Sequence, residues 1–304
     1  MINKYEITNG RIVTSEQERS PILVFTNPDE VERKYLLEEL KIDEHTLTSA
    51  LDPDELSRLE FEPDHIAIIF KRPRNYSGKD KLLFKVGSCG VFLFKTHLVL
   101  VQTEDLQLFD GKQFANVQSL NETVLKLLYR SIFHFLEHLK VITMITDDLE
   151  RKINKAMENK YPLNLFTLEK SLVYYLNAIN SNGGLIEKLK NNSAKLGFTT
   201  GESELLDDLI IENNQCYRQS EIHSNILASL MDARASIVGN NLNVLMKTLN
   251  LITISIMVPT LVVSIFSMNV PIPGQDQQHS FWLIMVLAIA SVGLMMYVWR
   301  RKKW

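Results

Sequence analysis

Two long uncharged segments near the C-terminus constrain this chain more than any other feature. They span residues 249–268 and 281–299, and neither contains Asp, Glu, Lys or Arg. Each is close to the ~20 residues that an α-helix needs to cross a hydrocarbon core of ~30 Å. We therefore predict two transmembrane helices in a lipid bilayer, joined by an external loop at 269–280. A buried helical hairpin of a soluble protein is the alternative.

Flanking charges predict the orientation of these spans. Lys247 precedes the first span, and residues 300–304 after the second carry two arginines and two lysines. The joining loop contains neither Lys nor Arg. The positive-inside rule then places both termini in the cytoplasm, with residues 300–304 as a basic tail. We expect a multi-pass membrane protein whose larger part is cytoplasmic.

The segment before the spans divides into two kinds of pattern. In residues 1–115, short β-branched or aromatic runs separated by Gly and Asn predict a sheet in a cytoplasmic α/β domain. The clearest runs are 65–70, 81–86, 91–94 and 97–102. Residues 116–248 instead show long helical periodicity, which predicts an arm and a stalk.

The predicted stalk helix continues into the first span. Helices at 120–160 and 163–190 precede a break at 197–201, and a last helix runs over 202–268. At ~1.5 Å per residue this helix is on the order of 100 Å long, more than one domain needs. It must pack against copies of itself or against neighbouring arms.

Several function classes are disfavoured. The net charge is -3 with both signs dispersed, which predicts no nucleic-acid partner. The domain lacks Gly-x-x-x-x-Gly-Lys and Gly-x-Gly-x-x-Gly, so we expect no nucleotide partner. Cys89 and Cys216 are far apart, so neither a disulfide framework nor a zinc finger is predicted.

One face of the last helix carries small polar side chains and methionines. Steps of three and four residues keep them on one line along the helix. This polar stripe consists of Asp232, Ser236, Gly239, Asn243, Met246, Asn250, Thr253, Met257, Thr260, Ser264 and Ser267. Polar groups at membrane depth are costly unless they face protein or water. A ring of identical subunits around an aqueous pore meets that requirement, and tight packing between helices is the alternative.

Such a ring suits a hydrated divalent cation. Asp232 would place carboxylates at the cytosolic mouth, and Met246 and Met257, with Leu249 beside them, would form apolar collars that close the pore. Neutral amides and hydroxyls suit an ion that keeps its water shell, and Mg²⁺ dehydrates reluctantly. A potential of 100 mV supplies ~2.3 kcal/mol per charge, so passive influx needs no nucleotide.

The same residues resemble the CorA family of magnesium transporters. The matching segments are 232–236, 239–249, 259–260 and 267–271. The resemblance implies an α+β cytoplasmic domain, a long helical stalk and two C-terminal transmembrane helices. It also implies a funnel-shaped homopentamer in the inner (plasma) membrane that admits Mg²⁺, with Co²⁺ or Ni²⁺ as further ions.

The family signature is Gly-Met-Asn at the outer end of the first span, where a ring of Asn side chains receives the ion. Ser267, Met268 and Asn269 stand at these positions. Ser adds a Cβ and a hydroxyl where Gly permits unusual backbone angles. A Zn²⁺ or broader divalent route is therefore an alternative, and a non-conducting membrane-anchored sensor is another.

The resemblance also implies roles for individual residues. Asp232 would stand at the cytosolic mouth, and Asp208 would bind a regulatory Mg²⁺ between subunits that holds the ring closed. A solvated helix face is the alternative for Asp208. The inner pore and gate would be lined by Asn243, Met246, Leu249, Met257 and Thr260, to which the polar stripe adds Asn250, Thr253 and Ser264.

One enzyme motif occurs in the predicted arm. His134 to His138 fits His-x-x-Glu-His, in which two histidines and a glutamate can form a metalloprotease site. The segment lies on a long helix with no further ligand helix evident. We therefore predict that the chain is not an enzyme.

Overall fold

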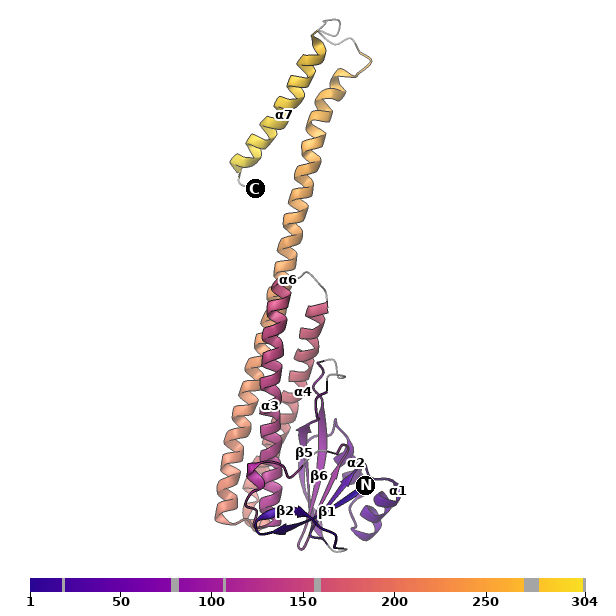
Figure 1. Ribbon diagram of the computed structural model, residues 1–304, viewed down its shortest axis with the longest axis vertical. Coiled ribbons are helices and arrows are strands. Elements are labelled where there is room, and N and C mark those ends of the chain that lie inside the picture. Colours follow the sequence, from indigo (N-terminus) through magenta and orange to yellow (C-terminus); the bar gives the residue numbers. More distant parts are fainter. Residues whose placement is uncertain (18–19, 78–81, 106–107, 156–159, 271–278, 303–304) are drawn as a thin grey trace. The chain divides into compact units, whose positions relative to one another are not determined.

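In the computed structural model the chain forms two compact units, Met1–Met231 and Asp232–Trp304 (Figure 1). The residues that it describes are 1–17, 20–77, 82–105, 108–155, 160–270 and 279–302. Residues 271–278 of the expected external loop and residues 303–304 of the expected tail lie outside them. Helix α6, Thr200–Phe266, contributes to both units.

A seven-stranded sheet forms the centre of the first unit. Its order is β2-β1-β3-β7-β6-β5-β4. All neighbours pair antiparallel except β3 and β7, which are parallel. The strands are β1 Ile2–Thr8, β2 Arg11–Thr14, β3 Ile22–Thr26, β4 Arg58–Phe61, β5 His65–Pro73, β6 Val86–Phe94 and β7 Leu98–Gln102.

The strand predicted at 81–86 is wrong over residues 82–85, which have no strand structure. Strand β6 begins at Val86 and continues through Gly87 and Gly90, although glycines at these positions predict turns between strands. A Cβ on Gly90 would collide with the Cβ of Ala50 in helix α2, Glu44–Leu51. Gly90 therefore permits a close approach between helix and strand. From the sequence alone, such a glycine cannot be told from one in a turn.

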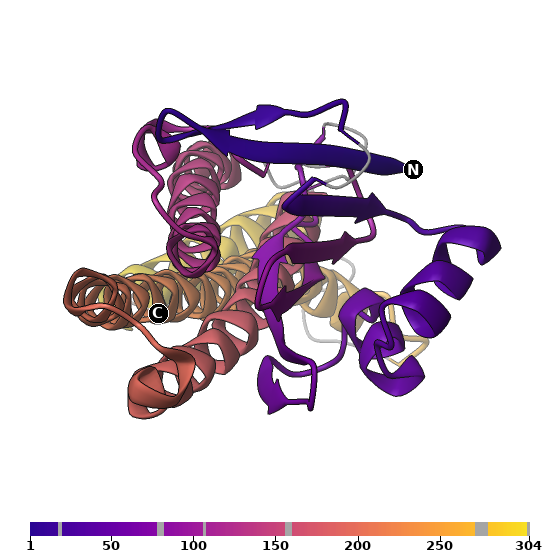
Figure 2. The same cartoon turned by 90° about the horizontal axis from the view of Figure 1, so that it is seen from below.

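Helices cover both faces of this sheet (Figure 2). The face toward α2 buries Leu36, Leu47 and Phe92, whereas the other face buries Phe70 with side chains of α3 and α4 such as Tyr175. The helices are α1 Glu30–Lys34, the π-helical turn η1 Tyr35–Glu39, α2 Glu44–Leu51, the 3-10 turn η3 Lys112–Phe114, α3 Leu120–Lys155, α4 Lys160–Asn191 and α5 Ser193–Leu196.

Helix α6 starts with a capping box. The Thr199 hydroxyl accepts from the Glu202 N–H at 3.2 Å, and the Glu202 carboxylate accepts from the Thr199 N–H at 2.8 Å. These bonds satisfy two helix-end donors, so the helix begins two residues before the predicted start. Within the first unit it buries Leu206, Leu209 and Cys216, which pack in the core shared with α3 and α4.

The second unit contains the rest of α6 and helix α7, Ser280–Lys302. Both helices are long and apolar enough to cross a membrane by length and composition. Helix α6 ends at Phe266, two residues before the expected end of the first span. Met268 and Asn269 therefore follow the helix as exposed residues at its C-terminal end.

Candidate functional site

Helices α6 and α7 pack through one face each within the second unit. Between residues 249 and 266, the partly covered residues of α6 lie on one face, at Leu251, Ser255, Val258, Pro259, Val262 and Phe266. On α7, Ala288 is buried, and the partly covered residues are Ser280, Ile284, Ser291, Val292 and Met295. The Ser255 hydroxyl lies 3.6 Å from the Met295 sulfur. These contacts fix which side of α6 faces its own second span.

The polar stripe lies on the opposite side of α6. With 3.6 residues per turn, the stripe members from Thr253 to Ser267 point roughly 130–170° away from the centre of the face that α7 covers, and Asn243 and Asn250 point roughly 110–130° away from it. The predicted pore residues are all exposed: Asn243, Met246, Leu249, Asn250, Thr253, Met257, Thr260 and Ser264. The chain thus leaves its most polar membrane-depth face without an intramolecular partner.

The threonine hydroxyls of the stripe are oriented by the helix. Thr253 Oγ1 donates to the Leu249 carbonyl at 2.9 Å, and Thr260 Oγ1 donates to the Ile256 carbonyl at 2.6 Å. Because the hydroxyl protons are used within the helix, the oxygens offer acceptor lone pairs to other groups. A hydrated cation presents water hydrogens outward, so such acceptors match its outer surface.

Apolar side chains interrupt the stripe at two levels. Met246 and Met257 are 50% and 63% exposed, and Leu249 next to the stripe is 56% exposed. The two methionines are eleven positions apart, which corresponds to ~16 Å along the helix axis. In a ring of copies, each level would form an apolar constriction between polar segments, the kind of constriction that closes by dewetting.

Ser267 closes the last turn at the signature position. Its N–H and its hydroxyl both donate to the Ser264 carbonyl, at 3.2 and 2.9 Å. Among the described residues, the non-glycine residues with positive φ do not include Ser267. The side chain is therefore accommodated without backbone strain where the signature has glycine.

The two predicted cytosolic carboxylates differ in their surroundings. Asp232 is exposed at the start of the second unit, and Asp208 is exposed on α6 in the first unit. Burial raises the pKa of Tyr129 on α3, and Glu212 and Asp208 raise it further. The neighbouring Asp207 pairs with the Lys190 ammonium at 2.7 Å. The described residues of one chain bring no three His, Cys, Asp or Glu side chains together to hold a metal.

The His-x-x-Glu-His segment serves packing in α3. His138 is buried, with Nδ1 2.5 Å from the Tyr175 hydroxyl. Glu137 is exposed and pairs with Arg130 at 3.0 Å. Burial lowers the pKa of His134 to about 3 and that of His138 to about 4. Both rings are therefore neutral at pH 7, and Glu137 is held by a surface ion pair.

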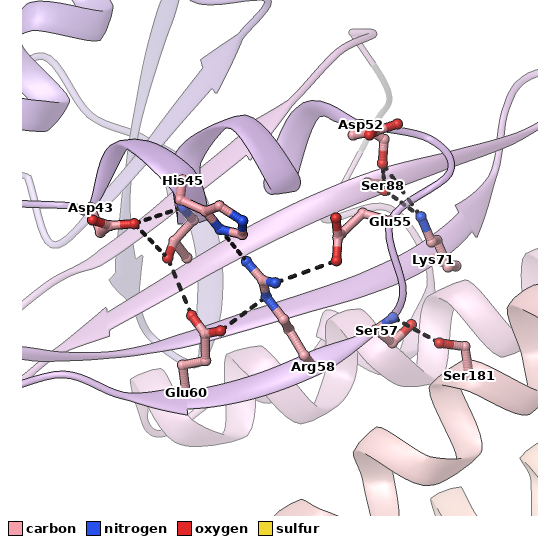
Figure 3. Close-up of polar contacts among 11 residues, drawn as sticks. Asp43, His45, Asp52, Glu55, Ser57, Arg58, Glu60, Lys71, Ser88 and Ser181 are labelled. Atoms are coloured by element: carbon pink, nitrogen blue, oxygen red, sulfur yellow. Dashed lines mark hydrogen bonds and ion pairs between the residues drawn. The ribbon is translucent and has the colours of Figure 1, made fainter.

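A buried polar cluster that the sequence analysis missed joins the sheet to α4. The Asn182 side chain accepts from the Lys71 N–H and donates to the Lys71 carbonyl, both at 2.8 Å. The Lys71 ammonium donates to the Ser88 hydroxyl at 2.7 Å (Figure 3). Burial lowers the pKa of Lys71 to about 8. The one sequence feature that could have indicated this cluster is the pair Lys71-Arg72, which follows the apolar residues 66–70 within β5.

Comparisons with known proteins agree over most of the chain. The family model for CorA-like Mg²⁺ transporter protein matches residues 20–301. The cobalt/magnesium transport protein CorA of Methanocaldococcus jannaschii is 24% identical over 296 residues, covering 91% of this chain and 89% of that protein. The complete structure of the CorA magnesium transporter from that organism has a TM-score of 0.84 at 19% identity, covering 99% and 98% of the two chains. The full-length CmaX structure has a TM-score of 0.74 at 16% identity, covering 99% and 97%.

Proposed function

Because the chain belongs to the family of CorA-like Mg²⁺ transporter proteins, we propose that it forms a passive channel for Mg²⁺ influx. The family transports divalent cations, and its members are membrane transporters with two C-terminal transmembrane helices and not enzymes. The finer proposal concerns the ion, the direction of flux, the assembly and the gate.

The position of the polar stripe carries this proposal. The stripe is exposed and lies opposite the α6 face that α7 partly covers. Exposed amides and hydroxyls at membrane depth are stable only against protein or water, and one chain supplies neither. A closed ring of identical subunits, which we propose to be a funnel-shaped homopentamer, supplies both.

We place this ring in the inner (plasma) membrane with both termini in the cytoplasm. The basic residues after α7 and the absence of Lys and Arg from the joining loop support that orientation. Ions would then meet the Asn269 ring first, pass the stripe and leave by the Asp232 ring. The membrane potential would drive a divalent cation inward along this route.

Cytosolic Mg²⁺ is proposed as the gating ligand. Asp208 is exposed, and the described residues of one chain gather no metal site around it. A second subunit would have to supply the remaining ligands. An ion bound there would tie neighbouring subunits in the closed state, and its loss at low cytosolic Mg²⁺ would release them.

The proposed channel could carry divalent cations besides Mg²⁺, and these are compared with it in the same experiment. The name of the M. jannaschii relative includes cobalt, which supports Co²⁺ as a further substrate, and Ni²⁺ belongs in the same trial. Ser267 in place of Gly keeps a Zn²⁺ or broader divalent route as the competing proposal, with a non-conducting sensor as the competitor from another class.

Ion uptake into liposomes tests the proposal. Purified protein is reconstituted, an inside-negative potential is imposed, and entry of Mg²⁺, Co²⁺, Ni²⁺ and Zn²⁺ is followed in parallel. We expect potential-dependent Mg²⁺ uptake that high internal Mg²⁺ suppresses. Asn269→Ala should abolish uptake because it removes the amide ring at the entrance.

Thr248→Ala is the matched control, since Thr248 is an exposed α6 residue outside the stripe and should leave uptake unchanged. Zn²⁺ entry without Mg²⁺ entry would favour the competing ion. No entry of any of the four would favour the sensor. Full uptake through the Asn269→Ala variant would contradict the role of Asn269.

A further inference from the structure

A cavity of about 340 Å³ lies in the first unit, away from every residue assigned to transport. Its walls come from β5 and β6 near the connection between them, from the loop after α2 and from α4. The residues that matter for its chemistry are Lys71, Arg74, Lys85, Lys170, Tyr174 and Asp54. We call this cavity the basic pocket.

The basic pocket has an excess of positive charge. Lys71, Lys85 and Lys170 line it with Arg74, which is paired with Glu104 outside the pocket, and Asp54 is the one carboxylate among the described lining residues. Lys71 is only 4% exposed. Its ammonium donates to neutral acceptors, the Ser88 hydroxyl at 2.7 Å and the Pro53 carbonyl at 2.9 Å. None of the described carboxylates lies within ion-pair distance of that ammonium.

A buried cation without a contacting anion is costly. Burial lowers the pKa of Lys71 to about 8 and outweighs the opposing effect of Asp52, Asp54 and Glu55, which act at longer range than an ion pair. An anion in the pocket would stabilise the charged ammonium and raise this pKa again.

An aromatic ring borders the same space. Tyr174 on α4 is 45% exposed, and the Lys170 ammonium lies 5.8 Å from the centre of its ring. The arrangement places a flat apolar surface beside a cluster of cations, a combination that fits a planar group attached to an anionic one.

We propose that the basic pocket binds a small anion that carries phosphate groups, either a free polyphosphate or a nucleotide. Lys and Arg make their strongest hydrogen bonds with phosphate oxygens, and Tyr174 would stack on a base where one is present. The expectation of no nucleotide partner rested on the absence of a phosphate-binding loop. Side chains from β5, α4 and the residues beside β6 would take the place of that loop. The proposal does not depend on the one for transport.

Isothermal titration calorimetry on the full chain in detergent tests it. Pyrophosphate and ATP are titrated separately in metal-free buffer. We expect saturable binding with a dissociation constant below about 1 mM for at least one of them. Lys85→Glu and Lys170→Glu should each weaken that binding at least about tenfold, since each replaces a charged hydrogen-bond donor with a repelling carboxylate.

The control is Lys188→Glu, which makes the same charge change on an exposed residue of α4 outside the pocket. Lys85 and Lys170 are also exposed, so the variants should unfold at the same temperature as the native chain. Buried Lys71 is left intact for that reason.

Tyr174→Leu distinguishes the two sources of phosphate. Weaker ATP binding with unchanged pyrophosphate binding supports the proposal and assigns a nucleotide. Unchanged binding of both supports it and shows that the pocket recognises the phosphate groups alone, without the base. The absence of saturable binding of both ligands would overturn the proposal, as would equal weakening by Lys188→Glu and the two pocket variants.

Discussion

The two halves of helix α6 are both helical, but the first is packed in the core of the first unit and the second is largely exposed. In the first unit it buries Leu206, Leu209 and Cys216, and the Asn213 amide donates to the Ile179 carbonyl of α4 at 3.1 Å. From Asp232 onward no described residue of α6 is fully buried, and α7 covers only one face in part. The first half therefore obtains its partners within the chain.

The second half must obtain its partners elsewhere. Its apolar faces are compatible with lipid, whereas the polar stripe is compatible only with water or protein. Contacts within one chain therefore account for the stability of the first half of α6 alone. The second half is explained by assembly, and its residues matter for ion passage more than for folding of the chain.

The largest expected effect on stability tests this division directly. Leu206 is fully buried, whereas Leu249 is 56% exposed. Leu206→Ala should destabilise the first unit by about 2–5 kcal/mol, because it leaves a cavity in a packed core. Leu249→Ala should leave unfolding of that unit unchanged and alter ion uptake. Thermal unfolding of the full chain followed by circular dichroism measures both, and equal losses of stability would contradict the division.

Sequence patterns predicted the second half of α6 better than the first unit. The three- and four-residue spacing that defines the polar stripe leaves Leu251, Val258 and Val262 off the stripe, and the structure has these three residues partly covered. Helical periodicity is a local property, so composition and spacing suffice for it.

The first unit depends on contacts between distant residues, which no local pattern encodes. Lys71 and Asn182 are 111 positions apart, yet they exchange two hydrogen bonds. Gly90 was treated as a break because nothing nearby reveals that Ala50 approaches it. The pore-lining roles of the stripe residues stay predictions, because one chain supplies only one of the α6 helices that a pore requires.

A second prediction concerns pH and only the first unit. His134 and His138 have pKa values of about 3 and about 4, lowered mainly by burial. The unfolded chain takes up protons near pH 6.5, and the folded chain does not. Their stabilisation is thus complete above pH 6.5 and lost as pH falls toward 4, by roughly 1.4 kcal/mol per pH unit for each ring.

The double variant His134→Gln, His138→Gln should reduce this pH dependence, as measured by thermal unfolding between pH 7 and 4, while burial of His65, His97 and His223, which also lowers their pKa values, leaves a smaller slope. His45→Gln changes an exposed histidine and should keep the native slope. If the double variant kept that slope as well, the buried rings would not be its source. The experiment measures unfolding of the first unit and is independent of ion passage through the second.

The smallest effect is expected at Asp232, which is exposed at the start of the second unit. Asp232→Asn should lower uptake a few-fold at low ionic strength by removing a ring of charge that attracts cations. The difference should shrink at 1 M salt, where the Debye length is about 3 Å. Asp147→Asn, at an exposed position on α3, should have no effect at either salt concentration.

Accessibility of single cysteines tests most directly whether the polar stripe faces water. Cys89 and Cys216 are buried, and burial raises their pKa values to about 11 and about 12, so the native thiols should be unreactive. Thr253→Cys places a thiol on the stripe, and Ile254→Cys places one on the adjacent face. A charged, water-soluble thiol reagent should modify the Thr253→Cys variant in liposomes and reduce its ion uptake, while sparing the Ile254→Cys variant. Modification of the Ile254→Cys variant with no reaction at Thr253→Cys would show that the stripe does not line a pore.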